Sequence, residues 1–273
     1  MIALTNASKD ETTLPRIAVP PAYTPAPRRH RLAKFGFVNP ASTRYDPRHL
    51  GSFARWAGDL HAKVVIVLSD WRTLPQYISQ KGQAACCTPL PDNTLRWERP
   101  ANGYLLQLLK SVGYDIGLPR DPKPAGIFLA DAVPFIGMGT VSKHARKCAL
   151  KYCAANYLAP LLDIIESQVV ICVGAAPTNA LFNHYHLAEP WVAHGIDKPD
   201  FMARMYNAPY DIRDGRTALF PVFHPGPLNQ RKRSVDHDRD GFSLMLRDWA
   251  RIKEWLVSCE PLASLESRVA SRE

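Results

Sequence analysis

Four short apolar runs lie along the chain, at residues 63–70 (KVVIVLSD), 125–133 (AGIFLADAV), 168–174 (QVVICVG) and 217–224 (TALFPVFH). They are rich in β-branched and aromatic residues and nearly continuous in hydrophobicity, which is typical of strands covered on both faces. Apolar residues at helical spacing lie between or after these runs, in segments 102–112, 146–166 and 241–257. Strands that alternate with helices predict an α/β fold, a three-layer α/β/α sandwich with a four-stranded parallel sheet.

The segments outside this alternation differ in composition. Residues 1–34 are rich in Pro and end in a basic run, which favours a flexible, solvated arm, with a DNA-binding arm as the alternative. We therefore expect a tail at 1–34, one folded domain at 35–258 and a short polar tail at 259–273. Residues 178–215 form a connection that is long for a compact domain, so they are either a functional insertion or contain helices.

Composition and charge exclude some classes of protein and indicate the kind of partner. The chain of 273 residues is 46% hydrophobic and 22% charged, which excludes a fibrous or mostly disordered protein. Its formal net charge of +9 suits a polyanionic partner, nucleic acid first.

No apolar run reaches the roughly 20 residues that span a bilayer, and the N-terminal residues lack the apolar stretch of a secretory signal. Six Cys without a CxxC pair favour a reducing, cytoplasmic setting. We expect a monomer that does not bind membranes.

Polar residues lie where the apolar runs end. The first run ends in Ser69-Asp70, the second contains Asp131, and the fourth ends in His224. Ligands of open parallel sheets bind beyond the carboxyl ends of the strands, so we expect these residues to meet at one edge. Taken alone, each Asp is more often a turn former or helix cap, and a strand-end His is more often structural. Their joint placement, beside a basic segment, predicts a hydrolytic site near phosphates.

Motifs at these strand ends resemble the uracil-DNA glycosylase superfamily. The sequence His224-Pro225-Gly226-Pro227-Leu228 resembles the family's HPSPL loop, with Gly in place of Ser, and is the most specific of the motifs. Residues 65–70 (VIVLSD) resemble the strand leading to the family's GQDP motif, of which the Asp is kept. Residues 130–133 (ADAV) resemble the strand end that carries the base-reading Asn, and residues 158–181 resemble the family's helix-strand-Gly-helix unit. The resemblance covers residues 64–256.

The resemblance implies a catalytic domain that flips a pyrimidine nucleotide out of DNA and hydrolyses its N-glycosidic bond. Asp70 would position or deprotonate the attacking water, and His224 would stabilise the charge that develops on the pyrimidine O2. Leu228, held out by Pro225 and Pro227, would fill the gap left by the flipped nucleotide. The other residues implied in DNA binding are Gly226 and Asn229 in the loop, and Arg231, Lys232 and Arg233 on phosphates.

Four residues are implied in recognition of the base: Asp131, Ser69, Trp71 and Tyr77. Backbone amides near Ser69 and Asp70 would assist. Trp71 or Tyr77 would stack on the base, with core packing as the alternative for either aromatic. Asp131 replaces the Asn that reads uracil by donating to O4 and accepting from N3–H. An ionised Asp would instead direct an acceptor at O4, which is itself an acceptor.

This replacement favours a cytosine edge. A carboxyl group matches that edge when it or the cytosine is protonated, and burial favours the protonated acid. Excision of ordinary cytosine would destroy the host genome, so a modified cytosine is the expected substrate. Arg72 replaces a Tyr that excludes the thymine methyl group in some members, which leaves room at C5. Modified cytosines are typical of virus-like DNA, so antiviral defence is a hypothesis alongside DNA repair.

Three alternatives remain open. A protonated Asp131 could donate to O4 of uracil, as in a uracil-DNA glycosylase of base excision repair. A catalytically inactive relative could bind DNA at a modified base, although the presence of both Asp70 and His224 favours the enzyme. An unrelated α/β nucleotide-binding protein is disfavoured, because the chain has neither GxGxxG nor GxxxxGK[ST].

The iron–sulfur branch of the superfamily requires four Cys ligands. Cys153 resembles the last of these, but Phe135 occupies the third position and the N-terminal CxxC is absent. One ligand of four cannot hold a cluster, so we interpret Cys153 as a small buried apolar residue. We expect no metal and no other cofactor.

Overall fold

A central sheet of five strands has the spatial order β5-β2-β7-β9-β8. The strands are β2 (Val64–Asp70), β5 (Ile127–Val133), β7 (Val169–Val173), β8 (Tyr210–Asp211) and β9 (Ala218–Val222). The four predicted strands are confirmed and run parallel, whereas β8 is a fifth strand, antiparallel to β9. The expected count of four was one short because β8 has only two residues and carries no apolar run of its own.

The computed structural model describes residues 32–38, 59–70, 100–115, 117–118, 121–122, 126–137, 139–187, 209–234 and 240–270. The helices in these ranges are η2 (Ala33–Phe35), α5 (Pro100–Ser111), α6 (Lys143–Cys153), η6 (Ala154–Leu158), α7 (Ala159–Ile165), α8 (Ala175–His184), α11 (Pro227–Ser234) and α12 (Gly241–Ala270). The same ranges contain two pairs of short antiparallel strands: β1 (Phe37–Val38) with β6 (Ile136–Gly137), and β3 (Gly117–Leu118) with β4 (Asp121–Pro122).

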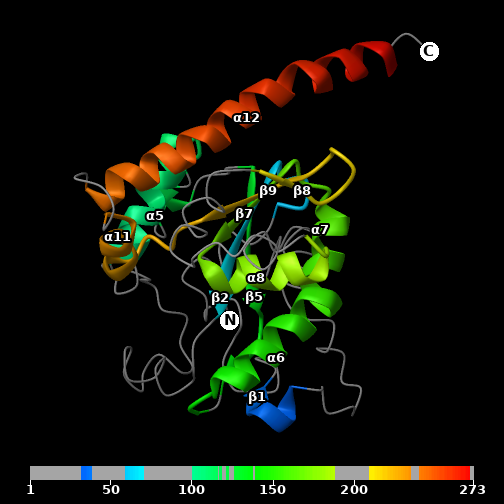
Figure 1. The fold of residues 1–273 in the computed structure, drawn as a ribbon. Helices are drawn as coiled ribbons and strands as arrows, with labels where there is room; N and C mark the ends of the chain where they lie inside the picture. The colour runs from blue at the N-terminus through cyan, green and yellow to red at the C-terminus, as the bar shows by residue number, and fades with distance from the viewer. Residues whose placement is uncertain are drawn as a thin grey trace, which may run out of the picture.

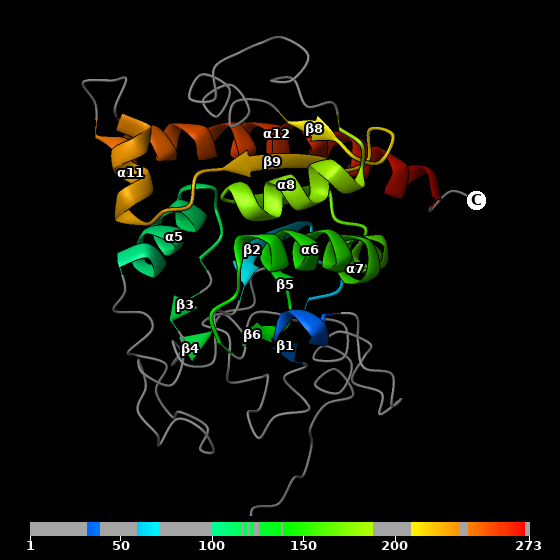
Figure 2. The ribbon, with the colours of Figure 1, turned by 60° about the horizontal axis from the view of Figure 1, so that its bottom comes forward.

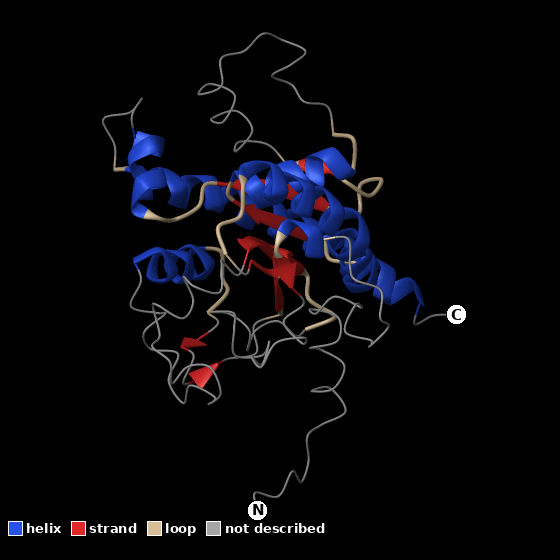
Figure 3. Cartoon of the chain, turned by 90° about the horizontal axis from the view of Figure 1, so that it is seen from below, coloured by secondary structure: helices blue, strands red, loops and turns tan. Residues whose placement is uncertain are grey.

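Helices cover both faces of the sheet and make the predicted three layers (Figures 1 and 2). On β2, Val64 and Ile66 pack in the cluster that contains Leu108 of α5 and Trp249 of α12. The intervening residues, of which Val65 is one, pack in the opposite cluster with residues of α7 and α8. Successive side chains of a strand point to opposite faces, so burial of both faces gives the continuous apolar runs of the sequence. Seen from below, the strands lie among the surrounding helices (Figure 3).

The predicted helix 146–166 is present but is not uniform. It begins earlier, at Lys143, where the Ser142 hydroxyl oxygen accepts a hydrogen bond from the Ala145 amide at 3.1 Å and caps the helix. Its centre is the π-helical turn η6, in which Ala159 donates to the carbonyl of Ala154. Pro160 follows directly and has no amide hydrogen, so an ordinary α-helical bond cannot form there. After this turn the helical segment continues as α7.

Two further segments differ from expectation. Helix α12 continues past residue 257 to Ala270, so the segment expected to be a polar tail from residue 259 is helical up to that point. Helix α8 occupies the beginning of the 178–215 connection and strand β8 lies near its end, while residues 188–208 lie outside the described part. At the other end of the chain, Leu32 is buried in a small cluster with Phe37 and Phe135, so packed structure includes residues before 35. Residues 1–31 are not among those described.

Within the described ranges, each helix is either too short or too polar to span a lipid bilayer.

Candidate active site

The carboxyl ends of the parallel strands bring two acidic positions together. In the β2–β5 register, Leu68 is paired with Asp131 and Asp70 with Val133. Asp131 therefore lies on the neighbouring strand, two residues before the level of Asp70, and its side chain is half-buried. Ser69, also half-buried, directly precedes Asp70 at this edge. The predicted meeting of these positions at one edge is present in the backbone.

The third strand contributes a glycine that lets two backbones approach. Gly174 follows β7 with φ of +93°, a conformation that side chains other than hydrogen rarely adopt. Its amide donates to the carbonyl of Val222 at 2.7 Å, at the end of β9. A Cβ atom on Gly174 would lie 3.3 Å from the Cβ of His224. Gly174 thus directly precedes α8 and leaves room for His224 beside it.

His224 has its imidazole oriented by the loop that follows. The Gly226 amide donates a hydrogen bond of 3.0 Å to Nδ1 of His224. An N–H group can donate only to an unprotonated ring nitrogen, so Nδ1 carries a lone pair and the proton of the neutral ring is on Nε2. A Cβ atom on residue 226 would lie 3.1 Å from Nδ1 and 3.3 Å from Cε1. This close packing explains why glycine suits the position where the resembled loop has Ser.

Helix α11 begins within the loop, at Pro227. Proline is well tolerated at the first position of a helix, because the amide there has no partner within the helix. The carbonyl of Gly226 accepts bonds from the amides of Asn229 and Gln230, at 2.9 and 3.1 Å. Leu228 lies in this first turn with 64% of its surface exposed. The expected loop is therefore short and leads directly into a helix that presents a leucine to solvent.

The basic run 231–233 lies on α11, and its members differ in surroundings. Arg231 is exposed, and Lys232 belongs to the helix without a described side chain. Arg233 instead binds Asp248 of α12 with two hydrogen bonds, Nε to Oδ2 at 3.1 Å and Nη2 to Oδ1 at 3.0 Å. Only 10% of the Arg233 side chain and 4% of the Asp248 side chain are exposed. The phosphate contact expected of Arg233 competes with this pair and stays a prediction.

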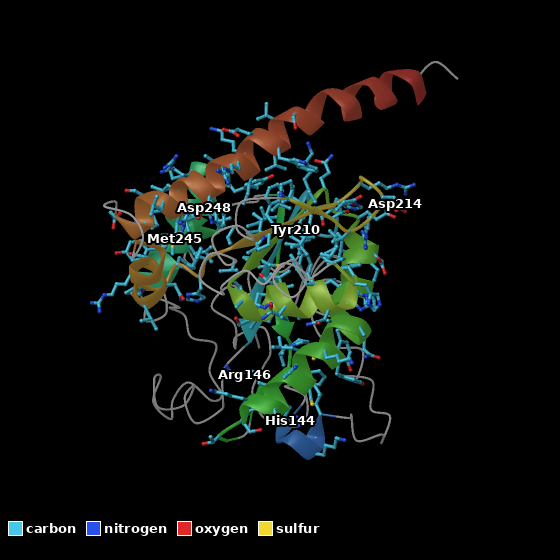
Figure 4. The ribbon with its side chains drawn as sticks, viewed as in Figure 1. His144, Arg146, Tyr210, Asp214, Met245 and Asp248 are labelled. Carbon is cyan, nitrogen blue, oxygen red and sulfur yellow. The ribbon has the colours of Figure 1, made fainter. Side chains whose placement is uncertain are left out.

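Sequence reasoning missed Asp248. It lies 15 residues from Arg233, on an apolar stripe of α12 that includes Met245 and Trp249 (Figure 4). An acidic residue within such a stripe is a signal for a buried partner, because carboxylates are rarely buried unpaired. Burial raises the pKa of the Asp248 carboxyl, and hydrogen bonding and charge from Arg233 oppose that rise. The arrangement has the geometry of a charge-assisted fork.

Several expected site residues remain outside the structural description. Trp71 and Tyr77 lie in the segment between β2 and α5 that is not described, and the side chain of Asp70 is not described either. Their roles therefore stay predictions. Pro225, by contrast, is buried, and its carbonyl accepts a 2.9 Å bond from the Gln230 side chain.

The interpretation of Cys153 is confirmed. Its side chain is fully buried beside Phe135 and Ala149, and burial raises the pKa of its thiol. Among the described residues, no group of three or more His, Cys, Asp or Glu side chains is arranged to hold a metal ion.

Comparison with known proteins identifies the family. The sequence model described as the uracil DNA glycosylase superfamily matches residues 97–250, more than half of the 273-residue chain. The matched part contains Asp131, His224 and helix α11, and it begins after β2 with Asp70. No curated protein matches the chain. Membership of this superfamily indicates a DNA glycosylase with DNA as its substrate. By this match, and with the α/β sheet that carries it, the chain belongs to the uracil DNA glycosylase superfamily.

Proposed function

We propose that the chain flips a pyrimidine nucleotide out of DNA and hydrolyses its N-glycosidic bond, leaving an abasic site. The observation that carries this proposal is the His224 geometry. With Nδ1 engaged by the Gly226 amide, Nε2 is the ring's hydrogen-bond donor. A neutral donor at a strand end is suited to an oxygen that gains negative charge.

The chemistry requires opposite charges to be stabilised on two sides of one bond. As the bond breaks, the sugar becomes cationic and the base leaves as an anion, with charge on the pyrimidine O2. His224 acts on the base side, where a preorganised donor contributes the most. Asp70 acts on the sugar side, where its carboxylate favours the cation and orients water. Both residues belong to strand ends on the same edge of the sheet.

Leu228 supplies the apolar wedge that occupies the stack after the nucleotide leaves. Unstacking a base costs a few kcal/mol, and an inserted side chain offsets part of that cost. Leu228 is suited to this role because it is exposed and lies four residues after His224. Arg231 and Lys232 on the same helix supply positive charge for the neighbouring phosphates.

For the substrate we propose a modified cytosine. Asp131 is half-buried at the level of Leu68, beside the strand that ends in Asp70. A carboxyl at the base-reading position accepts from the N4 amino group of cytosine. It also matches N3 when one of the two groups carries a proton. A site built for one base edge rejects the mismatched edge by as much as about 10⁴–10⁵-fold. Processing of modified foreign DNA in the cytoplasm is the role that this preference suits.

The test compares wild type with Asp131→Asn on oligonucleotides that contain uracil, cytosine or a C5-substituted cytosine, with alkali-labile strand breaks as the readout. We expect wild type to release the C5-substituted cytosine and the variant to shift towards uracil. Efficient release of uracil alone by wild type would favour the repair enzyme and contradict the assignment of Asp131. Binding without release on every substrate would identify an inactive DNA-binding relative. His224→Ala, expected to lose most of the activity, is the control for release by this site.

A further inference from the structure

A buried ion pair connects the helix that carries the exposed Leu228 to α12. Arg233 lies in the last turn of α11, and Asp248 lies on α12, which packs on the sheet. Their fork-to-carboxylate contact consists of two hydrogen bonds of 3.1 and 3.0 Å. A bidentate contact fixes both distance and orientation, whereas a single bond leaves rotation free.

The same guanidinium also reaches the strand end that bears the histidine. The Arg233 guanidinium carbon lies 5.6 Å from the centre of the Phe223 ring, within the range of a cation–π contact. Phe223 is the residue directly before His224. Arg233, which belongs to α11, thus contacts α12 through Asp248 and, through Phe223, the residue that follows β9.

Backbone contacts limit the remaining freedom of α11. A Cβ atom on Gly241, the first residue of α12, would overlap the carbonyl oxygen of Gln230. The two helices therefore touch main chain to main chain at that point. The Gln230 side chain in turn donates to the carbonyl of Pro225, in the loop between His224 and Leu228. The 225–228 loop, helix α11 and helix α12 are therefore connected by direct contacts, and the Arg233–Asp248 pair adds a further contact between the two helices.

We propose that Arg233 and Asp248 are positioning residues for base flipping, which hold Leu228 and His224 in fixed relation so that insertion of the leucine and alignment of the histidine occur together. This inference rests on the proposed glycosylase function. It assigns Arg233 a role different from that of Arg231 and Lys232 in the same basic run, since its charge is compensated inside the protein.

Stability alone is a weak reason for such a pair. A buried ion pair is often replaceable by apolar residues of similar volume without loss of stability, because desolvation of the charges offsets their attraction. An apolar pair would fill the same space but would lack the directional fork. Geometry is therefore the property that the ion pair supplies and that an apolar replacement removes.

The experiment measures base release from duplex and from single-stranded DNA that carries the same target base. In Asp248→Asn and Arg233→Lys we expect kcat on the duplex to fall by about tenfold to 100-fold, the scale of a displacement of about 1 Å at a reacting group. KM should change little, since the phosphate contacts remain. Release from single strands should fall less, because only the alignment of His224 is lost there, whereas duplex DNA also loses the insertion of Leu228 into the stack. Equal losses on both substrates would overturn the proposal.

A double variant and an activity-independent readout separate positioning from folding. Arg233→Met with Asp248→Leu keeps the volume apolar and should keep the melting temperature near wild type, yet show the same duplex-selective loss. Hydrogen exchange of the amides in residues 228–234 should be faster in all three variants. Arg213→Ala, which breaks an ion pair with Asp163 elsewhere on the molecule, is the matched control and should change neither readout.

The two proposals fail in different ways. Absence of base release by wild type on every substrate would refute the glycosylase function, and the exchange data would then decide on the ion pair alone. Unchanged exchange in residues 228–234 of the double variant would show that the pair does not fix α11 and would overturn the positioning role. Normal duplex activity in that variant would overturn it as well.

Discussion

Arg233–Asp248 and Arg213–Asp163 join the same two residue types at opposite edges of the sheet. The first pair lies at the carboxyl edge, between α11 and α12, with both side chains almost fully buried. The second lies at the amino edge, between the β8–β9 turn and α7, and 67% of the Asp163 side chain is exposed. Figure 4 shows Asp248 near α11 and Asp214 of the β8–β9 turn at the other end of the molecule. An exposed pair contributes about 0–1 kcal/mol, whereas breaking one side of a buried pair costs about 3–5 kcal/mol.

The two edges also differ in how their polar groups are satisfied. At the amino edge, besides the Arg213–Asp163 pair, side chains bond to the main chain: Thr217 donates to the carbonyl of Ser167 at 2.7 Å, and Asp211 accepts from the amides of Arg213 and Gly215. At the carboxyl edge, a backbone amide orients His224 and makes Nε2 the donor of its ring. The amino edge bonds within the protein, although among the described residues the buried Ser167 hydroxyl has no hydrogen-bond partner there, and the carboxyl edge carries the groups that we propose act on DNA.

Asp70→Asn should have the largest effect and would test this difference most directly. Removal of the charge at the sugar side should lower single-turnover base release by orders of magnitude, while DNA binding, measured by fluorescence anisotropy, stays close to wild type. Thr217→Val at the amino edge is the control. It should lose about 1 kcal/mol of stability from the missing hydrogen bond and keep its activity. Full activity in Asp70→Asn would remove this residue from the mechanism.

Leu228→Ala should have the next largest effect. Without the wedge, the cost of unstacking is no longer offset, so release from duplex DNA should fall by about tenfold, which corresponds to about 1.4 kcal/mol. Val257→Ala is the matched control, because Val257 is also an exposed apolar residue but lies far along α12. A similar decrease on single-stranded DNA would mean that Leu228 only packs within its own loop.

Neutralising Arg231 and Lys232 should have a smaller effect, seen in the salt dependence of binding. Removal of each interaction with a phosphate should reduce the slope of log affinity against log salt by about 0.9 on duplex DNA. Arg213→Ala, at the amino edge, should leave the slope unchanged. A slope that does not respond to the α11 variants would place the DNA on another surface.

The smallest effect concerns the pH dependence of stability. Because burial raises the native pKa of Asp248, its carboxyl holds a proton more firmly in the folded than in the unfolded chain. Its contribution therefore makes the free energy of unfolding decrease as pH rises from the unfolded value of about 3.9 to the raised native value, and stay constant above it. Asp248→Asn should flatten this segment of a urea-unfolding series. Parallel curves for the variant and wild type would contradict this.

A structural feature could be predicted from this sequence when it depends on residues that are close together in the chain. The four long strands could be predicted because each is an apolar run buried on both faces, and His224 could be placed because a strand end defines an edge. Strand β8 could not be predicted, since its two residues owe their conformation to pairing with Leu219 and Ala218. The contact of Arg233 with Asp248 could not be predicted either, because it depends on how α11 packs against α12 and not on residues that are neighbours in the sequence. Asp248 within an apolar stripe was the only local trace of it.

The start of α11 at Pro227 has a consequence for how the protein finds its target. A leucine in the first turn of a helix is ordered before any DNA arrives, so the conformational entropy of that segment is lost during folding and not on association. Binding that requires no ordering step proceeds at a rate set by encounter and orientation, which a basic surface accelerates. Under the proposed function, such a preordered leucine would let the protein test many base pairs in brief contacts, with the time spent at each governed by how readily the base leaves the stack.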